Sequence, residues 1–175
     1  MFRLVLGLWL ALVATVAQAG LLSSTFTSID GGELALSDWD GRPVLVVNTA
    51  SRCAFTDQYE ELQAVYDTYR DAGLVVLAVP SNDFRQELGS AEEVQAFCEL
   101  TYGIDMPMTD ITPVTGAAAH PFYKAVRDAT GFEPRWNFNK VLIGADGEVV
   151  GTWGSRVKPD GRAITQAIDD ALSAR

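Results

Sequence analysis

The sequence predicts an α/β protein in which a central mixed sheet is flanked by helices and preceded by an N-terminal β-hairpin. Three observations support this class: short apolar runs alternate with helical periodicity, a strand–helix–strand unit comes early, and a second hairpin followed by a helix comes late. The chain has 175 residues, 48% of them hydrophobic, which is enough for one core. It has no internal repeat, low-complexity tract or linker, so a single domain is expected.

The first elements follow from local patterns. Residues 25–36 are typical of a hairpin that turns at Asp30-Gly31-Gly32. The apolar run over residues 44–48 predicts a buried strand, and residues 57–70 predict a helix. The apolar and aromatic side chains that share one face of this helix are Tyr59, Leu62, Tyr66 and Tyr69.

The middle of the chain continues the alternation. Residues 74–79 predict a second buried strand, closed by Pro80. Residues 90–100 predict a helix, because Ser90-Ala91-Glu92-Glu93 has the pattern of a capping box. A further helix is expected over residues 121–128, with proline in its first turn.

The C-terminal part predicts a hairpin and a last helix. Residues 141–143 and 148–153 are expected to pair across Asp146-Gly147. The buried stripe of the last helix comprises Ile164, Ala167, Ile168, Ala171 and Leu172. A strand–helix–strand start followed by a hairpin and a helix is typical of the thioredoxin fold, a three-layer α/β sandwich.

The first nineteen residues have the layout of a secretory signal peptide. Arg3 gives a positive start, residues 4–16 are apolar apart from one threonine, and Ala17-Gln18-Ala19 offers a cleavage site before Gly20. The apolar stretch is short for a membrane span, although an uncleaved anchor is the alternative. We expect a mature domain of residues 20–175 that is exported to a periplasm or secreted.

Charge limits the possible partners. The formal net charge is −10 and the pI is near 4.4. Nucleic acid binding requires clustered Lys and Arg, and so does electrostatic attachment to anionic lipid. The composition therefore predicts neither nucleic acid binding nor stable membrane association.

Cys53 lies where a chain can place a reactive thiol. It follows the predicted strand over residues 44–48 and precedes a helical pattern that begins near Asp57. The N-terminal end of a helix presents free N–H groups and a positive dipole, which favour the thiolate. Two simpler interpretations stay open: a plain buried cysteine, and a structural disulfide with Cys98, the other cysteine.

Five segments of the sequence, in the same order, resemble the glutathione peroxidase family. The resemblance runs from about Phe26 to Leu172. It implies a thioredoxin fold and a thiol peroxidase, which reduces hydrogen peroxide or organic hydroperoxides in response to oxidative stress. The segments that carry it are Asn48-Thr49-Ala50-Ser51-Arg52-Cys53-Ala54-Phe55-Thr56, residues 73–82, Gln86-Glu87-Leu88-Gly89-Ser90, residues 120–124, and Trp136-Asn137-Phe138-Asn139-Lys140.

The resemblance also implies which residues act. In the family a catalytic tetrad occupies the positions of Cys53, Gln86, Trp136 and Asn137, with cysteine in place of selenocysteine. The last three are neutral hydrogen-bond donors, which can stabilise a thiolate and hold a peroxide. No metal and no cofactor are expected besides a thiol reductant. His120, the one histidine, is expected to cap or pack a helix.

The segment around Cys98 resembles the resolving-cysteine segment of the thioredoxin-dependent branch of the family. In that branch the sulfenic acid formed on the peroxidatic cysteine condenses with the resolving cysteine, and a dithiol reduces the disulfide. The resemblance therefore implies a Cys53–Cys98 disulfide. The reductant is a thioredoxin-like protein or glutathione. The short region before Trp136 favours a monomer.

Two other functions remain possible at this point. An exported thiol–disulfide oxidoreductase shares the fold, but Thr56 occupies the place of the second cysteine of a C-x-x-C pair. A structural thioredoxin-fold domain held by a Cys53–Cys98 disulfide is also possible. A copper chaperone would need more ligands than Cys53 and His120 supply. Peroxide consumption by the reduced protein, before any thiol partner is added, separates these functions.

Overall fold

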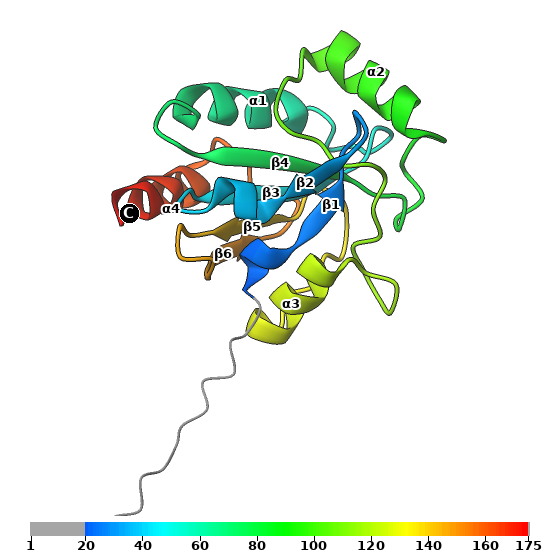
Figure 1. Ribbon diagram of the computed structural model, residues 1–175. Helices are drawn as coiled ribbons and strands as arrows, with labels where there is room; N and C mark the ends of the chain where they lie inside the picture. Colours follow the sequence, from blue (N-terminus) through cyan, green and yellow to red (C-terminus); the bar gives the residue numbers. More distant parts are fainter. Residues whose placement is uncertain (1–19, 175) are drawn as a thin grey trace, which may run out of the picture.

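The central sheet is mixed, and the middle of the fold is its strand β3. In the computed structural model, which describes residues 20–174, the strand order is β4-β3-β5-β6 (Figure 1). β3 pairs in parallel with β4 and antiparallel with β5, and β6 pairs antiparallel with β5. The strands are β3 (Val44–Thr49), β4 (Val75–Pro80), β5 (Lys140–Ile143) and β6 (Val149–Trp153). The predicted signal peptide, residues 1–19, lies outside the described residues.

The N-terminal hairpin is separate from this sheet. β1 (Thr25–Thr27) and β2 (Glu33–Ala35) pair antiparallel, as the sequence predicts. Its turn contains Gly31 and Gly32, whose φ angles are 88° and 80°, a region that disfavours other residues. Two short 3₁₀ helices flank the hairpin, Leu21–Ser23 and Leu36–Trp39.

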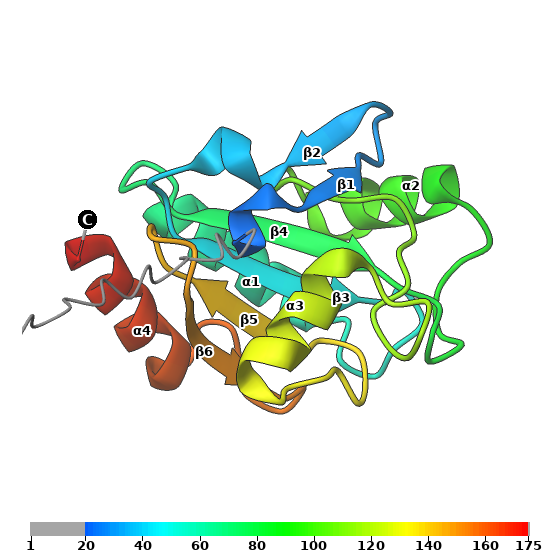
Figure 2. The same cartoon turned by 60° about the horizontal axis from the view of Figure 1, so that its bottom comes forward.

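Helices cover both faces of the sheet. Figure 1 shows α1 (Gln58–Tyr69) and α2 (Ala91–Tyr102) above the sheet and α3 (Pro121–Thr130) below it. α4 (Arg162–Ser173) contributes to the same core as α1 and α2. Figure 2 shows α3 crossing the opposite face near the hairpin. The predicted three-layer arrangement is confirmed.

Side-chain alternation explains why the central strands are apolar throughout. Leu45 and Val47 of β3 point into the core beneath α1, α2 and α4. Val44 and Val46 point into the second core, which α3 and the hairpin cover. Because successive side chains of a strand face opposite ways, a strand buried on both faces needs an unbroken apolar run.

The predicted elements differ from the observed ones only at their ends. α2 begins at Ala91 because Ser90 is its N-cap, and the Ser90 hydroxyl accepts a hydrogen bond from Glu93 N at 3.3 Å. β5 starts at Lys140, one residue earlier than predicted, and β6 starts at Val149, one residue later. The connection over residues 103–120 is held by isolated bridges, including Ala78 with Met108.

Candidate active site

The sheet topology brings three loops to one edge. β3 and β4 are parallel, so the turn with Cys53 and the loop with Gln86 both leave the sheet at the carboxyl ends of these strands. β5 is antiparallel to β3 and begins at this edge, which places Trp136 and Asn137 there as well. The structure therefore brings the predicted tetrad to one edge, although its members come from segments up to 84 residues apart, counted from Cys53 to Asn137.

Cys53 lies in the turn that joins β3 to α1. Its exposed fraction is 4%. Thr56 N donates to the Cys53 carbonyl at 3.2 Å, and Tyr59 N donates to the Thr56 carbonyl at 2.9 Å, so successive tight turns lead into the helix. α1 begins at Gln58. The thiol therefore precedes a helix N-terminus, as the sequence predicts, with the turn of residues 54–57 between them.

The Gln86 and Asn137 amides bond to each other. Asn137 Nδ2 donates to Gln86 Oε1 at 3.0 Å. The Gln86 carbonyl accepts a hydrogen bond from Arg52 N at 2.8 Å, which ties Gln86 to the residue beside Cys53. Because the Gln86 oxygen is occupied by Asn137, its NH₂ group is the end left to donate to a charged sulfur or oxygen.

The backbone is strained next to each of these amides. Arg85 has a φ of 57° and Phe138 a φ of 59°, and within residues 20–174 they are the non-glycine residues with positive φ. Such conformations are costly for residues with a Cβ and are found mainly where function or tertiary contacts require them. Here one immediately precedes Gln86 and the other immediately follows Asn137, so both direct the amides.

Trp136 combines a fixed backbone with an accessible ring. Its carbonyl accepts hydrogen bonds from Asn48 Nδ2 at 3.0 Å and from Asn139 Nδ2 at 2.6 Å. Its exposed fraction is 41%, and the ring packs against Phe84 with centroids 5.5 Å apart. Among the described residues the indole N–H has no hydrogen-bond partner, so it is free to donate to a substrate or to sulfur.

Asn48 is an anchoring residue that sequence reasoning did not single out. It is fully buried at the end of β3. Besides its bond to the Trp136 carbonyl, its Oδ1 accepts from Asn139 N at 3.0 Å and its carbonyl accepts from Phe138 N. A polar residue that ends an apolar strand was the available signal. Asn48 holds the Trp136–Asn139 segment against the strand that leads to Cys53.

Lys140 is a buried residue that bonds to the start of α1, just after the turn that carries Cys53, and it too was not singled out from the sequence. Its Nζ donates to Gln58 Oε1, to the Val157 carbonyl at 2.7 Å and to the Ser155 carbonyl at 3.4 Å. Desolvation lowers the pKa of Lys140 to about 7, and the charge of Glu61 opposes this. These bonds fix the first residue of α1 relative to the loop after β6.

Cys98 lies in α2, the helix that follows the loop with Gln86. It is fully buried in the core that also contains Cys53, and both cysteines are free thiols. Desolvation raises the pKa of Cys98 to about 11; the Tyr59 hydroxyl opposes this, and the Glu87 charge adds to it. Burial and this raised pKa keep Cys98 as a neutral thiol at neutral pH in this conformation.

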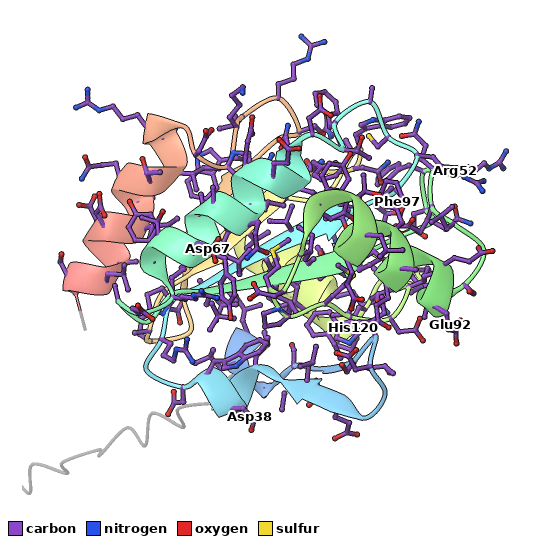
Figure 3. All side chains as sticks on the ribbon, turned by 90° about the horizontal axis from the view of Figure 1, so that it is seen from above. Asp38, Arg52, Asp67, Glu92, Phe97 and His120 are labelled. Atoms are coloured by element: carbon purple, nitrogen blue, oxygen red, sulfur yellow. The ribbon has the colours of Figure 1, made fainter. Side chains whose placement is uncertain are left out.

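Two other residues considered from the sequence have structural or surface roles. His120 is the N-cap of α3: its Nδ1 accepts from Phe122 N at 3.3 Å, and its ring stacks on Phe26 at 4.0 Å. The predicted capping and packing role is confirmed. Arg52, beside Cys53, is exposed, and Figure 3 shows its side chain at the rim of the molecule, on the side of Phe97.

A cleft of about 800 Å³ opens beside Trp136. Its apolar walls include Phe55, from the turn that carries Cys53, with Phe132 and Val157. Three arginines also line it: Arg127, Arg135 and Arg156. The cleft therefore offers an apolar surface with positive charge, in a chain whose net charge is −10.

Two further features were sought in the part of the chain that the structure describes. No group of three or more His, Cys, Asp or Glu side chains within residues 20–174 is arranged to hold a metal ion. No helix in this range has the length and apolar character needed to cross a membrane.

Known proteins resemble the chain over most of its length. A family model described as glutathione peroxidase matches residues 21–127. "Hydroperoxy fatty acid reductase gpx1" of Synechocystis sp. is 42% identical over 144 residues, covering 76% of this chain and 85% of the relative. "Thioredoxin/glutathione peroxidase BtuE" of Escherichia coli is 32% identical over 181 aligned residues, covering 89% of this chain and 99% of the relative.

Solved structures of known proteins also resemble the chain. The apo form of Trgpx is 31% identical with a TM-score of 0.71, covering 88% of this chain and 96% of that one. A thiol:disulfide interchange protein of the thioredoxin family from Chlorobium tepidum is 19% identical with a TM-score of 0.62, covering 87% and 97%, which supports the fold alone. The predicted thioredoxin fold is confirmed.

Proposed function

Because the chain belongs to the glutathione peroxidase family and is a thiol peroxidase, we propose that Cys53 is the residue that reduces the hydroperoxide. Its thiolate attacks one oxygen of ROOH, the O–O bond breaks, and Cys53 sulfenic acid and, after protonation, ROH result. The observation that supports this best is that Cys53, Gln86, Trp136 and Asn137 meet at one edge of the sheet, with the Asn137 and Gln86 amides bonded at 3.0 Å.

Neutral hydrogen-bond donors stabilise the negative charge on sulfur and on the leaving oxygen. The Gln86 NH₂ and the Trp136 indole N–H are left free to donate, either to the thiolate or to the oxygen that leaves. Asn137 fixes the Gln86 amide by occupying its oxygen. Such donors carry no charge of their own, so the enzyme does not have to desolvate a cation beside the sulfur.

Trp136→Phe and Gln86→Ala are each expected to slow oxidation of Cys53 by roughly 10²-fold, the usual effect of losing a donor to a developing anion. Stopped-flow mixing of reduced protein with hydrogen peroxide measures this rate. Trp39→Phe is the matched control, since Trp39 packs against the second core. Rates of the Trp136 and Gln86 variants equal to that of Trp39→Phe would show that the two residues only pack.

We propose that Cys98 resolves the sulfenic acid. The Cys98 sulfur attacks the Cys53 sulfur, the disulfide forms, and the thiol proton leaves with the hydroxyl group as water. A disulfide needs Cα atoms within about 7 Å. Because Cys98 is fully buried in α2, local opening of this helix must precede the reaction.

A thiol then reduces the disulfide by exchange. The name of the Escherichia coli relative includes both thioredoxin and glutathione, and a resolving cysteine favours a thioredoxin-like dithiol. The experiment that tests the function measures peroxide consumption by the reduced protein alone, then turnover with glutathione and with a thioredoxin-like donor side by side. A protein that consumes no peroxide is not acting as proposed.

The cleft beside Trp136 favours a hydroperoxide with an apolar chain and an acid group. Arg127 is occupied by Glu133 at 3.4 Å and by Asp128 at 3.7 Å. Arg135 and Arg156 make no ion pair with any residue from 20 to 174. They are therefore available to a carboxylate while the aromatic walls hold its chain. The name of the Synechocystis relative, hydroperoxy fatty acid reductase, supports the same substrate class.

The double substitution Arg135→Ala/Arg156→Ala is expected to lower the rate constant for oxidation of Cys53 by a fatty acid hydroperoxide about 5- to 10-fold. An exposed ion pair contributes up to about 1 kcal/mol. The rate with hydrogen peroxide should change less than about twofold, because it lacks the carboxylate. Arg162→Ala, an exposed charge on α4, is the control variant. Equal losses with both peroxides would contradict this assignment.

We also propose that residues 1–19 direct export and that residues 20–175 form one monomeric domain, without a cofactor other than the thiol reductant. N-terminal sequencing of the protein from the cells that express it is expected to begin at Gly20, because Ala17 and Ala19 satisfy the small-residue rule for cleavage. A mature chain that begins at Met1 or Phe2 would favour a membrane anchor instead.

A further inference from the structure

A buried polar cluster lies between the peroxidatic turn and the resolving helix, and the steps above do not use it. Within residues 20–174, seven buried side-chain nitrogen or oxygen atoms have no hydrogen-bond partner. Four of the seven belong to this cluster: Thr49 Oγ1, Ser51 Oγ, Tyr59 OH and Glu87 Oε2. Buried groups without partners are uncommon, and a concentration of them calls for a functional explanation.

The cluster is continuous from one cysteine region to the other. The Ser51 hydroxyl is close enough to the Glu87 carboxylate to influence its ionisation, and the Tyr59 hydroxyl faces both Thr49 and the Cys98 thiol. None of these contacts has the geometry of an ordinary hydrogen bond. Glu87 is thus bonded to the turn of Cys53 through Ser51 N, and both its carboxylate and the Tyr59 hydroxyl lie near enough to the Cys98 thiol to influence its ionisation.

Glu87 fastens the peroxidatic turn to the segment that leads into α2. Its Oε1 accepts hydrogen bonds from Ser51 N at 2.9 Å and from Leu88 N at 2.8 Å. Ser51 precedes Cys53 by two residues, and Leu88 precedes the N-cap of α2 by two residues. Gln86, the adjacent residue, is tied to the same turn through Arg52 N.

The negative charge on buried Glu87 lowers the stability of the folded state. Desolvation raises its pKa, and hydrogen bonds from Ser51 and Leu88 and the charge of Arg52 only partly oppose this. The other titratable groups that interact with it are Tyr59 and Cys98. A carboxyl group with a raised pKa in the folded state contributes stability at low pH that is lost as pH rises through that pKa. A glutamine amide oxygen could accept the same two hydrogen bonds without this loss.

We propose that Glu87 is a positioning residue that couples reduction of the peroxide by Cys53 to formation of the Cys53–Cys98 disulfide. For the first reaction it holds Gln86 and the turn of Cys53 together. It also holds the start of α2 closed over Cys98 until Cys53 is oxidised. This inference rests on the proposed roles of Cys53 and Cys98. In this proposal the bond between Ser51 N and Glu87 breaks as α2 opens, which lets the two sulfurs meet.

The carboxylate also protects the resolving thiol. While α2 is closed, the negative charges of Glu87 and of Glu99 add to the desolvation that keeps Cys98 as a neutral thiol, so Cys53 is the thiol that reacts with peroxide. When the helix opens, Cys98 leaves this charge and gains water. The thiol then attacks the sulfenic acid of Cys53, and its proton departs with the hydroxyl group as water.

Two substitutions separate the hydrogen bonds from the charge. Glu87→Ala removes both, and Glu87→Gln keeps an oxygen for Ser51 N and Leu88 N but removes the charge. Glu93→Gln is the matched control, because Glu93 Oε2 accepts from Gly89 N at 2.9 Å on the same segment but is exposed. The full-length mature protein is used throughout.

Three measurements are made on each variant. Stopped-flow mixing with hydrogen peroxide gives the rate of Cys53 oxidation. The rate of Cys98 alkylation by iodoacetamide as a function of pH, measured in a Cys53→Ser background, reports closure of α2 and ionisation of the thiol. The unfolding temperature at pH 7 reports stability.

For Glu87→Ala we expect Cys53 oxidation to slow about tenfold or more and Cys98 alkylation at pH 7 to accelerate about tenfold or more, since two buried hydrogen bonds to a charged group are lost. For Glu87→Gln we expect oxidation within about threefold of the parent. Its alkylation profile should move to lower pH, and its unfolding temperature should rise. A merely structural carboxylate would not move the alkylation profile.

Several results would overturn the proposal. The first is that Glu87→Ala has oxidation and alkylation rates within about twofold of the parent. The second is that Glu93→Gln changes these rates as much as the Glu87 variants do. The third is that the pH profile of Cys98 alkylation does not move in Glu87→Gln, and this result decides the matter if Glu87→Ala does not fold. The alkylation measurement involves no peroxide. It therefore tests Glu87 separately from the proposed function, which fails instead if the parent protein consumes no peroxide.

Discussion

Cys53→Ser is expected to abolish hydroperoxide turnover while leaving the fold intact. A free thiol has a pKa near 8.5 and its anion is a strong nucleophile, whereas a hydroxyl group is far too weakly acidic to supply an anion at neutral pH. Serine is close to cysteine in size, so the turn before α1 should form as before. Peroxide consumption and circular dichroism, measured on the same sample, check both parts.

Cys98→Ser serves as the control for this variant, because it removes the other buried cysteine while leaving Cys53 available for one oxidation. A correctly folded Cys53→Ser protein that still consumes peroxide at the parent rate would show that Cys53 is not the nucleophile. The convergence of Gln86, Trp136 and Asn137 at the same edge would then need another explanation.

Cys98→Ser is expected to lose turnover with a thioredoxin-like donor while still reducing about one equivalent of peroxide per chain. The sulfenic acid formed on Cys53 then has no internal thiol to condense with. It should persist long enough to be trapped by a sulfenate reagent, or be oxidised further to sulfinic acid when peroxide is in excess. Mass spectrometry of the Cys53 peptide after each treatment distinguishes these products.

Normal turnover of Cys98→Ser with a thioredoxin-like donor would make Cys98 a packing residue of α2. Its full burial and its raised pKa fit either role in the closed state, and turnover of this variant distinguishes the two roles. Turnover of this variant with glutathione alone would identify a one-cysteine peroxidase.

Most of the fold could be predicted because its signals are local. Strands buried on both faces require unbroken apolar runs, which mark β3 and β4, and Gly31-Gly32 and Asp146-Gly147 mark the turns of both hairpins. The ends of the elements were less predictable. β5, for example, begins at Lys140 and not at Val141 as predicted, because Lys140 pairs with Val47 of β3 and with Trp153 of β6.

The candidate site was predictable only where the family resemblance supplied residues. The roles of Asn48 and Glu87 arise from contacts with segments far along the chain, Trp136–Asn139 and Ser51, which no local pattern contains. The strained backbone at Arg85 and Phe138 has the same origin, since neither residue type favours a positive φ. These positions are set by tertiary contacts that meet at one edge of the sheet.

The most direct test of the central claim is a peptide map of the reduced protein after one equivalent of hydrogen peroxide, with no thiol donor present. Our account predicts that the peroxide is consumed and that the peptides containing Cys53 and Cys98 are recovered linked by a disulfide. Recovery of Cys53 as an unmodified thiol after the peroxide has been consumed would contradict it.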